Sequence, residues 1–411
     1  MPITHNYQTF DYQTFDNYEK MPNFAAVIHK LNSYMKNPFV TKGYAGPAYF
    51  CDRVKETEDL VKMLTNENNM ALISPRRIGK TDLIHHCFAQ PEIKDAYYTF
   101  IIDIYATNSL ADFVEVFGRA IFEELKPLGK KVWEGFYHTI KSVQQQISFD
   151  INGNPVWGIG LGNYINPTTT LEEIFTYLGS ADKPCLVAID EFQKITEYPD
   201  GENVEAALRT HIQRCPNATF LFCGSKRHLM TEIFLSPSRP FYQSVVTMGL
   251  DAISKDKYSE FAVRQFAMYD KILDADVVEQ VYLRFDGVTA YLQRMMNVLF
   301  MNTPKGEHCT VDMIEEAIDF IISLNSEHYE TLFSQMSEKQ RVTFLAIAME
   351  GRAKSISSSQ FVRKYRLNSS SSVVSAVRGL LEKDFITFEH NEYYVYDYFF
   401  PIWLRKNGYI N

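Results

Sequence analysis

Three residues in the first quarter of the chain, Gly79, Lys80 and Thr81, have the types and spacing that bind a polyphosphate. Backbone N–H groups around a glycine at a helix N-terminus donate to phosphate oxygens, the lysine reaches the outer phosphates, and the threonine hydroxyl can ligate magnesium. The apolar run 70–73 precedes them and a helical pattern over 82–88 follows, which predicts a strand, a phosphate-binding loop and a helix. The alternative is that Gly-Lys-Thr only caps a surface helix.

The loop departs from the common pattern G-x-x-x-x-G-K-[ST] at its first position, where Ser74 replaces glycine. Serine has a small backbone cost there if the position requires a positive φ, which would reshape the loop without excluding it. We expect the nucleotide to contact the whole of this stretch, namely Ser74, Pro75, Arg76, Arg77, Ile78, Gly79, Lys80, Thr81 and Asp82.

An acid pair, Asp190 and Glu191, follows the buried-strand pattern at residues 184–189. In open α/β sheets, ligands bind at the carboxyl ends of the strands. Asp190 is expected to organise a magnesium ion together with Thr81, and Glu191 to polarise the water that attacks the terminal phosphate. An acid pair also suits a helix N-terminus, where the dipole favours it, but its occurrence with Gly79-Lys80-Thr81 favours the catalytic interpretation.

A further strand pattern at residues 219–223 ends beside Ser225. If this strand lies between the loop strand and the acid strand, the Ser225 hydroxyl lies near the terminal phosphate and its attacking water. We therefore expect Lys80, Glu191 and Ser225 to form the catalytic set.

The other patterns describe the elements that position these residues. Residues 97–105, with Asp103 as their one charge, and residues 245–250 have the composition of strands, and 110–128 have helical spacing. Alternating apolar residues around Asn152-Gly153 predict a hairpin inserted at about 147–162. The helix-rich segment 252–329 is interpreted as a helical lid.

Three helices and a hairpin complete the chain, in the order typical of a winged helix. The helices are expected from the capped start at Ser337 to residue 349, over 358–365 and over 369–383, and the hairpin over 385–396. The third helix offers mainly serines with Arg378 and Lys383, so its thin positive charge favours a protein-facing role and leaves DNA as an alternative partner. The aromatic segment 397–404 is expected to pack back on a core.

The composition predicts a globular protein, because 411 residues that are 46% hydrophobic can bury at least two cores. A net charge of −9 argues against general affinity for nucleic acid or anionic membranes, although a local basic patch is compatible with it. Six scattered cysteines suit a reducing compartment, and the absence of a leader or a long apolar run favours a cytoplasmic location without membrane contact. The repeated YQTFD at residues 7–16 is either a docking arm or a poorly ordered tail.

Together these motifs resemble the archaeal-type and bacterial ATPases of the AAA-like STAND group, P-loop ATPases that are often coupled to a winged helix. The resemblance covers roughly residues 45–250. Besides the phosphate loop it rests on Phe50-Cys51-Asp52-Arg53 with Glu56, Ile189-Asp190-Glu191-Phe192-Gln193, Gly224-Ser225 and Pro240-Phe241-Tyr242.

The resemblance implies ATP with magnesium, a sheet of order 5-1-4-3-2, Arg53 as a further residue of the nucleotide site, and conformational change under nucleotide control. After the tyrosine the family commonly has Gly-Arg, whereas this chain has Gln243-Ser244, so Arg239 is the candidate substitute at the phosphates. The stretch 286–292 resembles the glycine-rich start of a lid helix, and Arg294 beyond it is either near the phosphates or on the surface.

We therefore predict an α/β fold of the P-loop NTPase (AAA-like) type, a parallel sheet with helices on both faces, followed by a helical lid and a winged-helix domain. The expected divisions are an N-terminal extension 1–44, an ATPase core 45–250, a lid 251–335 and a winged helix 336–411. The predicted function is magnesium-dependent ATP binding and hydrolysis that drives a conformational switch in the lid and winged helix, with a protein client and a homo-oligomer as further expectations. The alternatives are a nucleotide-gated DNA-binding regulator with little hydrolysis and a scaffold that no longer binds nucleotide.

Overall fold

The computed structural model describes residues 37–125, 147–149, 155–157 and 167–411. The chain divides into two compact units, Met1–Pro38 and Phe39–Asn411, and the second contains the sheet and its helices. The repeated YQTFD lies outside the described residues. The predicted insertion at 147–162 is described only as two short antiparallel strands, β3 (Ile147–Phe149) and β4 (Pro155–Trp157).

The centre of the second unit is a five-stranded parallel sheet with the order β2-β5-β6-β1-β7. Numbered along the sheet-forming strands alone, this is the predicted order 5-1-4-3-2, so the topology is confirmed. β6 lies between β1 and β5, as the assignment of Ser225 required. The strands are β1 (Met70–Ile73), β2 (Tyr98–Asp103), β5 (Cys185–Asp190), β6 (Ala218–Gly224) and β7 (Val246–Gly249).

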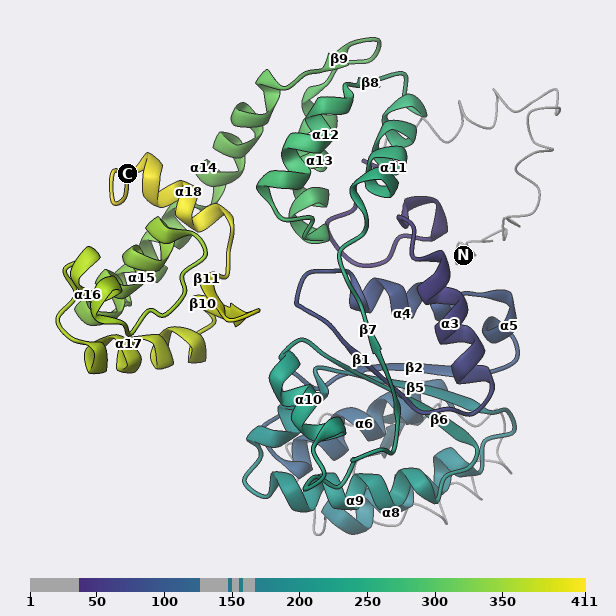
Figure 1. Cartoon of the computed structure of the whole chain (residues 1–411). Helices are drawn as coiled ribbons and strands as arrows, with labels where there is room; N and C mark the ends of the chain where they lie inside the picture. The colour runs from purple at the N-terminus through teal and green to yellow at the C-terminus, as the bar shows by residue number, and fades with distance from the viewer. Residues whose placement is uncertain (1–36, 126–146, 150–154, 158–166) are drawn as a thin grey trace, which may run out of the picture. The chain divides into compact units, whose positions relative to one another are not determined.

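Helices cover both faces of the sheet, which explains why its central strands are apolar in nearly every position. Along β1, Met70 and Leu72 join the core on one face, whereas Ala71 and Ile73 join the core on the other. One face is covered by α3 (Val54–Thr65), α4 (Lys80–Phe88) and α5 (Pro91–Lys94). The other is covered by α6 (Leu110–Glu124), α8 (Pro167–Gly179), α9 (Gly201–Gln213) and α10 (Arg227–Leu235) (Figure 1).

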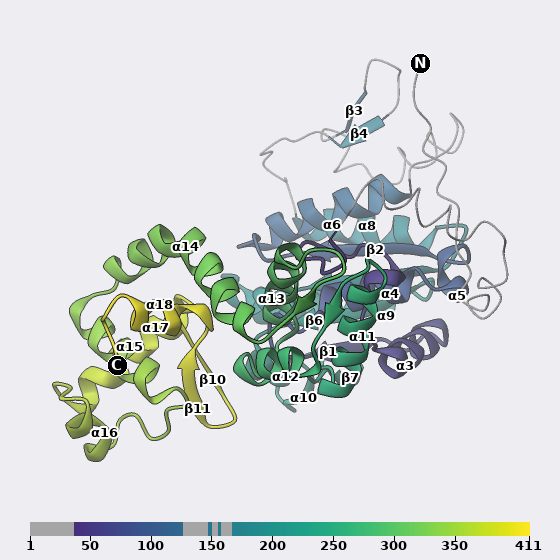
Figure 2. The same cartoon turned by 90° about the horizontal axis from the view of Figure 1, so that it is seen from above.

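Two groups of helices follow the sheet along the chain, and the long helix α14 (Asp312–Ser334) connects them. The first comprises α11 (Lys255–Ala267), α12 (Ala275–Arg284) and α13 (Thr289–Asn302), with β8 (Ile272–Leu273) paired to β9 (His308–Cys309). Helix α14 runs from this group to the last elements (Figures 1 and 2). These are α15 (Glu338–Glu350), α16 (Ser359–Lys364), α17 (Ser370–Glu382), the hairpin β10 (Ile386–Glu389) and β11 (Glu392–Val395), and α18 (Phe399–Lys406).

Local sequence explains where the last helices begin. The Ser337 side chain accepts from the N–H of Gln340, whose side chain accepts from the N–H of Ser337, which is a capping box at the predicted start. Ser358 and Ser369 cap α16 and α17 through single side-chain bonds. The three helices and the hairpin thus form as expected.

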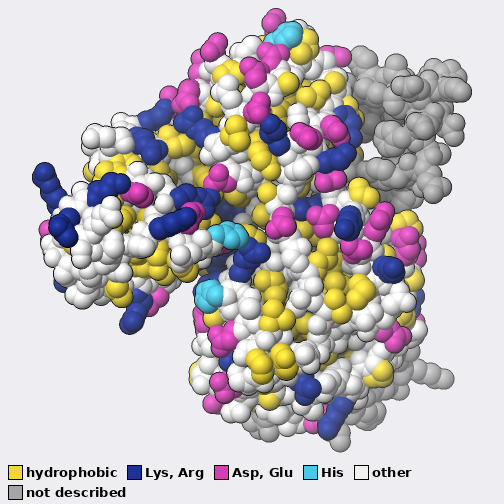
Figure 3. Space-filling view, in the orientation of Figure 1, with side chains coloured by type: hydrophobic (Ala, Val, Ile, Leu, Met, Phe, Trp, Pro, Cys, Tyr) yellow, Lys and Arg dark blue, Asp and Glu magenta, His cyan; other side chains and the backbone are white. Residues whose placement is uncertain are grey.

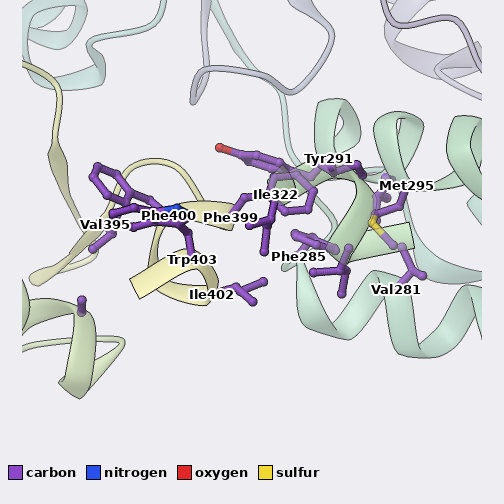
Figure 4. Close-up of a cluster of buried hydrophobic side chains, with 14 of the residues drawn as sticks. Val281, Phe285, Tyr291, Met295, Ile322, Val395, Phe399, Phe400, Ile402 and Trp403 are labelled. Carbon is purple, nitrogen blue, oxygen red and sulfur yellow. The ribbon is translucent and has the colours of Figure 1, made fainter. Parts of the chain in front are cut away.

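The lid and the last elements share one hydrophobic core. Phe399 of α18 packs against Phe285 and Tyr291 from the α12 and α13 region (Figure 4). Phe400 and Trp403 of the same helix pack against Tyr329 of α14. The rings of Phe285 and Phe399 are 5.0 Å apart between centroids. The C-terminal aromatic segment therefore packs back on a core, as predicted, and no break in packing marks the expected boundary at residue 335.

Gly224 ends β6 where the side chains of Gln193 and Met230 lie close to its Cα, and this predicts a specific cost for added volume. A Cβ at Gly224 would lie 2.3 Å from both Gln193 Oε1 and Met230 Sδ, whereas a Cβ at Gly249 meets no described atom within 4 Å. Both glycines pair with Ile73 in the sheet, so they form a matched pair. We expect Gly224→Ala to lower the free energy of unfolding by about 1–3 kcal/mol and Gly249→Ala to change it by less than about 0.5 kcal/mol. Equal midpoints in chemical denaturation would contradict the crowding at Gly224.

Candidate functional site

The loop between β1 and α4 has the backbone of an anion-binding turn. Gly79 adopts φ 93° as the N-cap of α4, and a Cβ there would meet no described atom within 4 Å. Arg77 also lies in the left-handed region, with φ 65°. Ser74 is fully buried and is not among the residues of positive φ, so the backbone cost considered for a serine at this position does not arise.

Lys80 and Thr81 begin α4 and connect the loop to the acid strand. The Thr81 hydroxyl donates to Asp190 Oδ2 at 2.7 Å. Lys80 is buried and donates weakly to the carbonyl of Pro75 at 3.4 Å. Burial lowers the pKa of Lys80, although the nearby charges of Asp190 and Glu191 act in the opposite direction. A phosphate group beside Lys80 would add a third anion and favour its charged form.

The acid pair is held at the end of β5 by defined bonds. Asp190 Oδ1 accepts from the backbone N–H of Glu191 at 2.9 Å. Glu191 itself has a left-handed backbone with φ 56°. Glu191 Oε2 accepts from Gln193 Nε2 at 2.5 Å and from the Ser225 hydroxyl at 2.8 Å. The structure therefore brings Thr81, Asp190, Glu191 and Ser225 together in one network.

Asp103 has a more ordinary position at the end of β2. It lies opposite Asp190 in the sheet, and one of its oxygens accepts from the N–H of Tyr105 at 2.8 Å. Partial desolvation raises the pKa of Asp103, and the charges of Asp190 and Glu191 add to this effect. Asp103 is an exposed residue at the end of β2, and its carboxylate adds negative charge near the acid pair.

A cavity of about 310 Å³ opens in front of the loop. Of the sequence-predicted residues, Arg53, the run 76–82 and Glu191 line it, whereas Ser74, Pro75, Asp190 and Ser225 lie outside its lining. The remaining wall was not among the predicted site residues, although it includes Thr289 and Ala290 from the predicted start of a lid helix. It is formed by residues 40–45 and 49–51, Ile253, Thr289, Ala290 and Gln293.

Contacts with the lid position this remaining wall. Asn297 on α13 donates to the carbonyl of Phe39 at 2.7 Å, and Gln265 on α11 donates to the carbonyl of Ala48 at 2.7 Å. At the start of α13, Ala290 N–H donates to the carbonyl of Arg77 at 3.0 Å. Lid contacts therefore hold both the segment 39–48 and the phosphate loop at the wall of the cavity.

Arg53 lines the cavity and also holds the phosphate loop. Its buried guanidinium pairs with Glu56 at 2.8 Å and donates to the carbonyls of Asp251 at 2.6 Å and Ile78 at 3.4 Å. These bonds fix the guanidinium at the wall of the cavity, and the nucleotide contact expected from the sequence stays a prediction.

Arg76 and Arg77 connect the loop to distant parts of the chain. Arg76 Nε donates to the Ser225 hydroxyl at 2.9 Å, and Arg76 Nη1 pairs with Asp384 at 2.8 Å. Burial opposes the Arg76 charge, but the hydrogen bond and charge of Asp384 outweigh it and the pKa of Arg76 is raised. Arg77 donates to the Tyr291 hydroxyl and lies 4.4 Å from the ring centroid of Tyr396.

Two arginines considered for the phosphates, Arg239 and Arg294, are not part of the cavity lining. Arg239 forms an ion pair with the fully buried Glu205, whose pKa burial raises to about 7. Arg294 places its guanidinium 5.5 Å from the ring centroid of Phe399. Within the described part of the chain, Arg53, Arg76 and Arg77 are the arginines that line the cavity.

Gln293 is a candidate site residue that the sequence analysis did not name, although it named the stretch 286–292 before it and Arg294 after it. It lines the cavity, and its Oε1 is buried without a hydrogen-bond partner among the described residues. An unpaired buried acceptor costs about 1–3 kcal/mol, so a ligand that donates to it would be favoured. The glycine-rich start of the lid helix was recognised, but sequence alone did not show which face of that helix is turned to the cavity.

Comparison with known proteins supports the fold. A family model described as a probable winged helix domain matches residues 327–406. The structure is similar to the Walker-type ATPase PABY2304 of Pyrococcus abyssi, with a TM-score of 0.60 and 17% identity, covering 90% of this chain and 99% of that chain. It is also similar to the ORC1 protein of Aeropyrum pernix, solved in complex with DNA, with a TM-score of 0.51 and 10% identity, covering 90% of this chain and 97% of that chain. Curated protein sequences give no match.

The chain therefore has the predicted fold, a P-loop ATPase sheet followed by a C-terminal winged helix. At these identities the likeness establishes architecture, and the narrower assignment to the STAND group stays a prediction. The family match begins at residue 327, inside α14 and before the predicted boundary at 336. In the described part of the chain, no helix combines the length and apolar character needed to cross a bilayer.

Proposed function

We propose that the protein binds ATP with magnesium and hydrolyses it, and that this drives a conformational change in the lid and winged helix. The observation that carries the proposal is the network in which Thr81 meets Asp190 while Ser225 meets Glu191, beside a cavity lined by the phosphate loop. Metal-holding and water-activating groups are thus separate but adjacent, as phosphoryl transfer requires.

The protein oxygens beside the phosphate loop fit a magnesium ion that is bound mainly through the phosphates of the nucleotide. No group of three or more His, Cys, Asp or Glu side chains that could hold a metal occurs among the described residues. Magnesium keeps several waters and commonly takes one or two protein oxygens together with substrate phosphates. Thr81 and Asp190 would supply those oxygens, and the metal when bound would neutralise charge that develops on the phosphates.

The chain's own groups have distinct roles in this proposal. Lys80 and the N–H groups at the start of α4 bind phosphate oxygens, and Arg76 and Arg77 add positive charge at the cavity wall. Glu191 accepts the proton of the attacking water. Gln193 and Ser225 fix its Oε2, which orients the carboxylate toward the cavity that Glu191 lines.

A continuous set of contacts supports coupling to the winged helix. The Tyr291 hydroxyl, which accepts from Arg77 of the loop, donates to the carbonyl of Tyr396 at 3.1 Å. The N–H of Tyr398 reaches the same hydroxyl at 3.4 Å. A change in the loop on binding phosphate would therefore act on one lid residue that also holds the winged-helix segment after β11.

Substitutions in the loop and at the proposed base separate binding from turnover. Lys80→Ala should weaken ATP binding by about 100-fold or more, because a buried charge that meets phosphate is lost. Glu191→Gln should keep ATP binding and reduce turnover by about 10²–10⁴-fold. Thermal shift with ATP and magnesium and phosphate-release assays measure the two effects, with exposed Lys55→Ala as the control. Wild-type turnover in Glu191→Gln would remove its role as base, and no thermal shift in the wild type would support the scaffold alternative.

Gln293→Met tests the unpredicted cavity wall. Methionine has a similar length and removes the unpaired acceptor, so the free energy of unfolding without nucleotide should stay the same or rise by about 1 kcal/mol. ATP affinity should fall by about 3- to 10-fold, because one hydrogen bond to the nucleotide is lost. Denaturation and ATP titration give the two quantities, and a variant that loses stability without losing affinity would show that Gln293 is only structural.

A specific charge distribution favours a second candidate function, nucleotide-gated DNA binding. Residues 336–411 contain eleven Lys and Arg against seven Asp and Glu, although the whole chain has a net charge of −9. Figure 3 shows Lys and Arg side chains on the visible face of this part, which Figure 1 identifies by α15 to α17. Arg378 on α17 and Lys383 just after it are exposed. These charges could contact the phosphate backbone while the serines of α17 approach base edges.

Arg378→Ala with Lys383→Ala tests this candidate. If α17 meets DNA, the pair should weaken binding to a duplex at low salt and reduce the slope of log affinity against log salt by about 2, one for each lost phosphate contact. The exposed Lys339→Ala on α15 is the control. No binding by the wild-type chain at low salt would count against a DNA partner and in favour of the protein client expected from the sequence.

A further inference from the structure

Asp384 places a winged-helix carboxylate at the phosphate loop. It lies between α17 and β10, and its Oδ2 accepts from Arg76 Nη1 at 2.8 Å across 308 residues of sequence. The Asp384 side chain is 39% exposed and that of Arg76 is 19% exposed, so water screens the pair incompletely. Asp384 has a backbone φ of 53°, a conformation that Asp and Asn adopt more readily than most residues.

The ion pair continues as a chain of hydrogen bonds to the proposed base. Arg76 Nε donates to the Ser225 hydroxyl oxygen at 2.9 Å, and the same hydroxyl donates to Glu191 Oε2 at 2.8 Å. Because a serine hydroxyl has one proton, the Arg76 donor occupies its acceptor side and directs that proton to Glu191. The position of the Arg76 guanidinium thus affects both the winged helix and the carboxylate that would activate water.

Arg76 also lines the cavity in which the phosphates of a nucleotide would bind. Its guanidinium would then have two anionic neighbours, Asp384 and the phosphate end of the nucleotide. Like charges in a partly desolvated site repel, so Asp384 and the phosphate would oppose each other at Arg76. ATP carries a terminal phosphate that ADP lacks, and this phosphate adds negative charge at the outer end of the nucleotide. The repulsion from Asp384 is therefore stronger for ATP than for ADP.

We propose that Asp384 is a positioning residue that competes with the terminal phosphate for Arg76, so that the winged helix restrains the ATPase site until ATP displaces it. The proposal rests on the function proposed above and identifies the contact through which the winged helix and the site regulate each other. The restraint is reciprocal by linkage: what weakens the Arg76–Asp384 pair favours ATP, and ATP weakens the pair.

Asp384→Asn tests this directly, because asparagine keeps the size and tolerates the same backbone conformation while removing the charge. We expect ATP affinity to rise by about 3- to 10-fold, with a smaller change for ADP, and turnover at low ATP to rise in parallel. Glu382→Gln, an exposed acid two residues away on α17, should leave both affinities unchanged. A merely structural Asp384 would lower thermal stability without changing the ratio of ATP to ADP affinity.

Arg76→Gln completes a double-mutant cycle. If Asp384 acts through Arg76, the Asp384→Asn effect on the ATP to ADP ratio should vanish in the Arg76→Gln background. An unchanged ratio in Asp384→Asn, or an effect that persists without Arg76, would overturn the competition. Failure of the wild-type chain to bind ATP would overturn the proposed function and this inference together, whereas ATP binding with an unchanged ratio would overturn the competition alone.

Discussion

The parallel register of β1, β6 and β5 is the constraint on which the site depends. Ile73 at the end of β1 pairs with Gly224 at the end of β6, and Ile189 near the end of β5 pairs with Phe222. The residues that come after these strands are therefore brought to one edge, although they belong to three separate regions of the sequence. The 2.7 Å bond from Thr81 to Asp190 and the 2.8 Å bond from Ser225 to Glu191 result from that register. A slip in the pairing of β6 would move Ser225 away from Glu191 and break the network.

Much of this edge could be predicted because each part carries its own local signal. Gly79-Lys80-Thr81, the acid pair and Ser225 each come after an apolar run, and parallel strands end together. The serine at the start of the loop does not strain the backbone, because the positive φ falls at Arg77 and Gly79 rather than at Ser74. The backbone conformation at a position, rather than the residue in the common sequence pattern, determines whether glycine is needed there.

The rest could not be predicted because it depends on which face of a helix meets which neighbour. Arg239 has the right charge near the right motif, but the buried Glu205 on α9 holds it. Arg294 and Gln293 are adjacent in sequence, and only Gln293 lines the cavity. The partner of Arg76 is 308 residues away in the winged helix, and no periodicity or motif relates the two positions. Local patterns thus identified the catalytic edge, whereas long-range packing determined its walls and its connection to the winged helix.

The aromatic core shared by the lid and α18 has a consequence for the behaviour of the chain as a whole. Phe285 and Tyr291 are covered by Phe399 from the last helix, so removal of the C-terminal segment would uncover apolar rings on the lid. The lid and winged helix are therefore expected to melt as a single cooperative block rather than as two separable modules. A fragment that lacks the C-terminal segment would aggregate through the exposed rings of the lid. A winged helix exchanged for this one would need C-terminal aromatic residues that pack against Phe285 and Tyr291. Evolutionary exchange of this C-terminal module is thus limited by its packing more than by its connection in sequence.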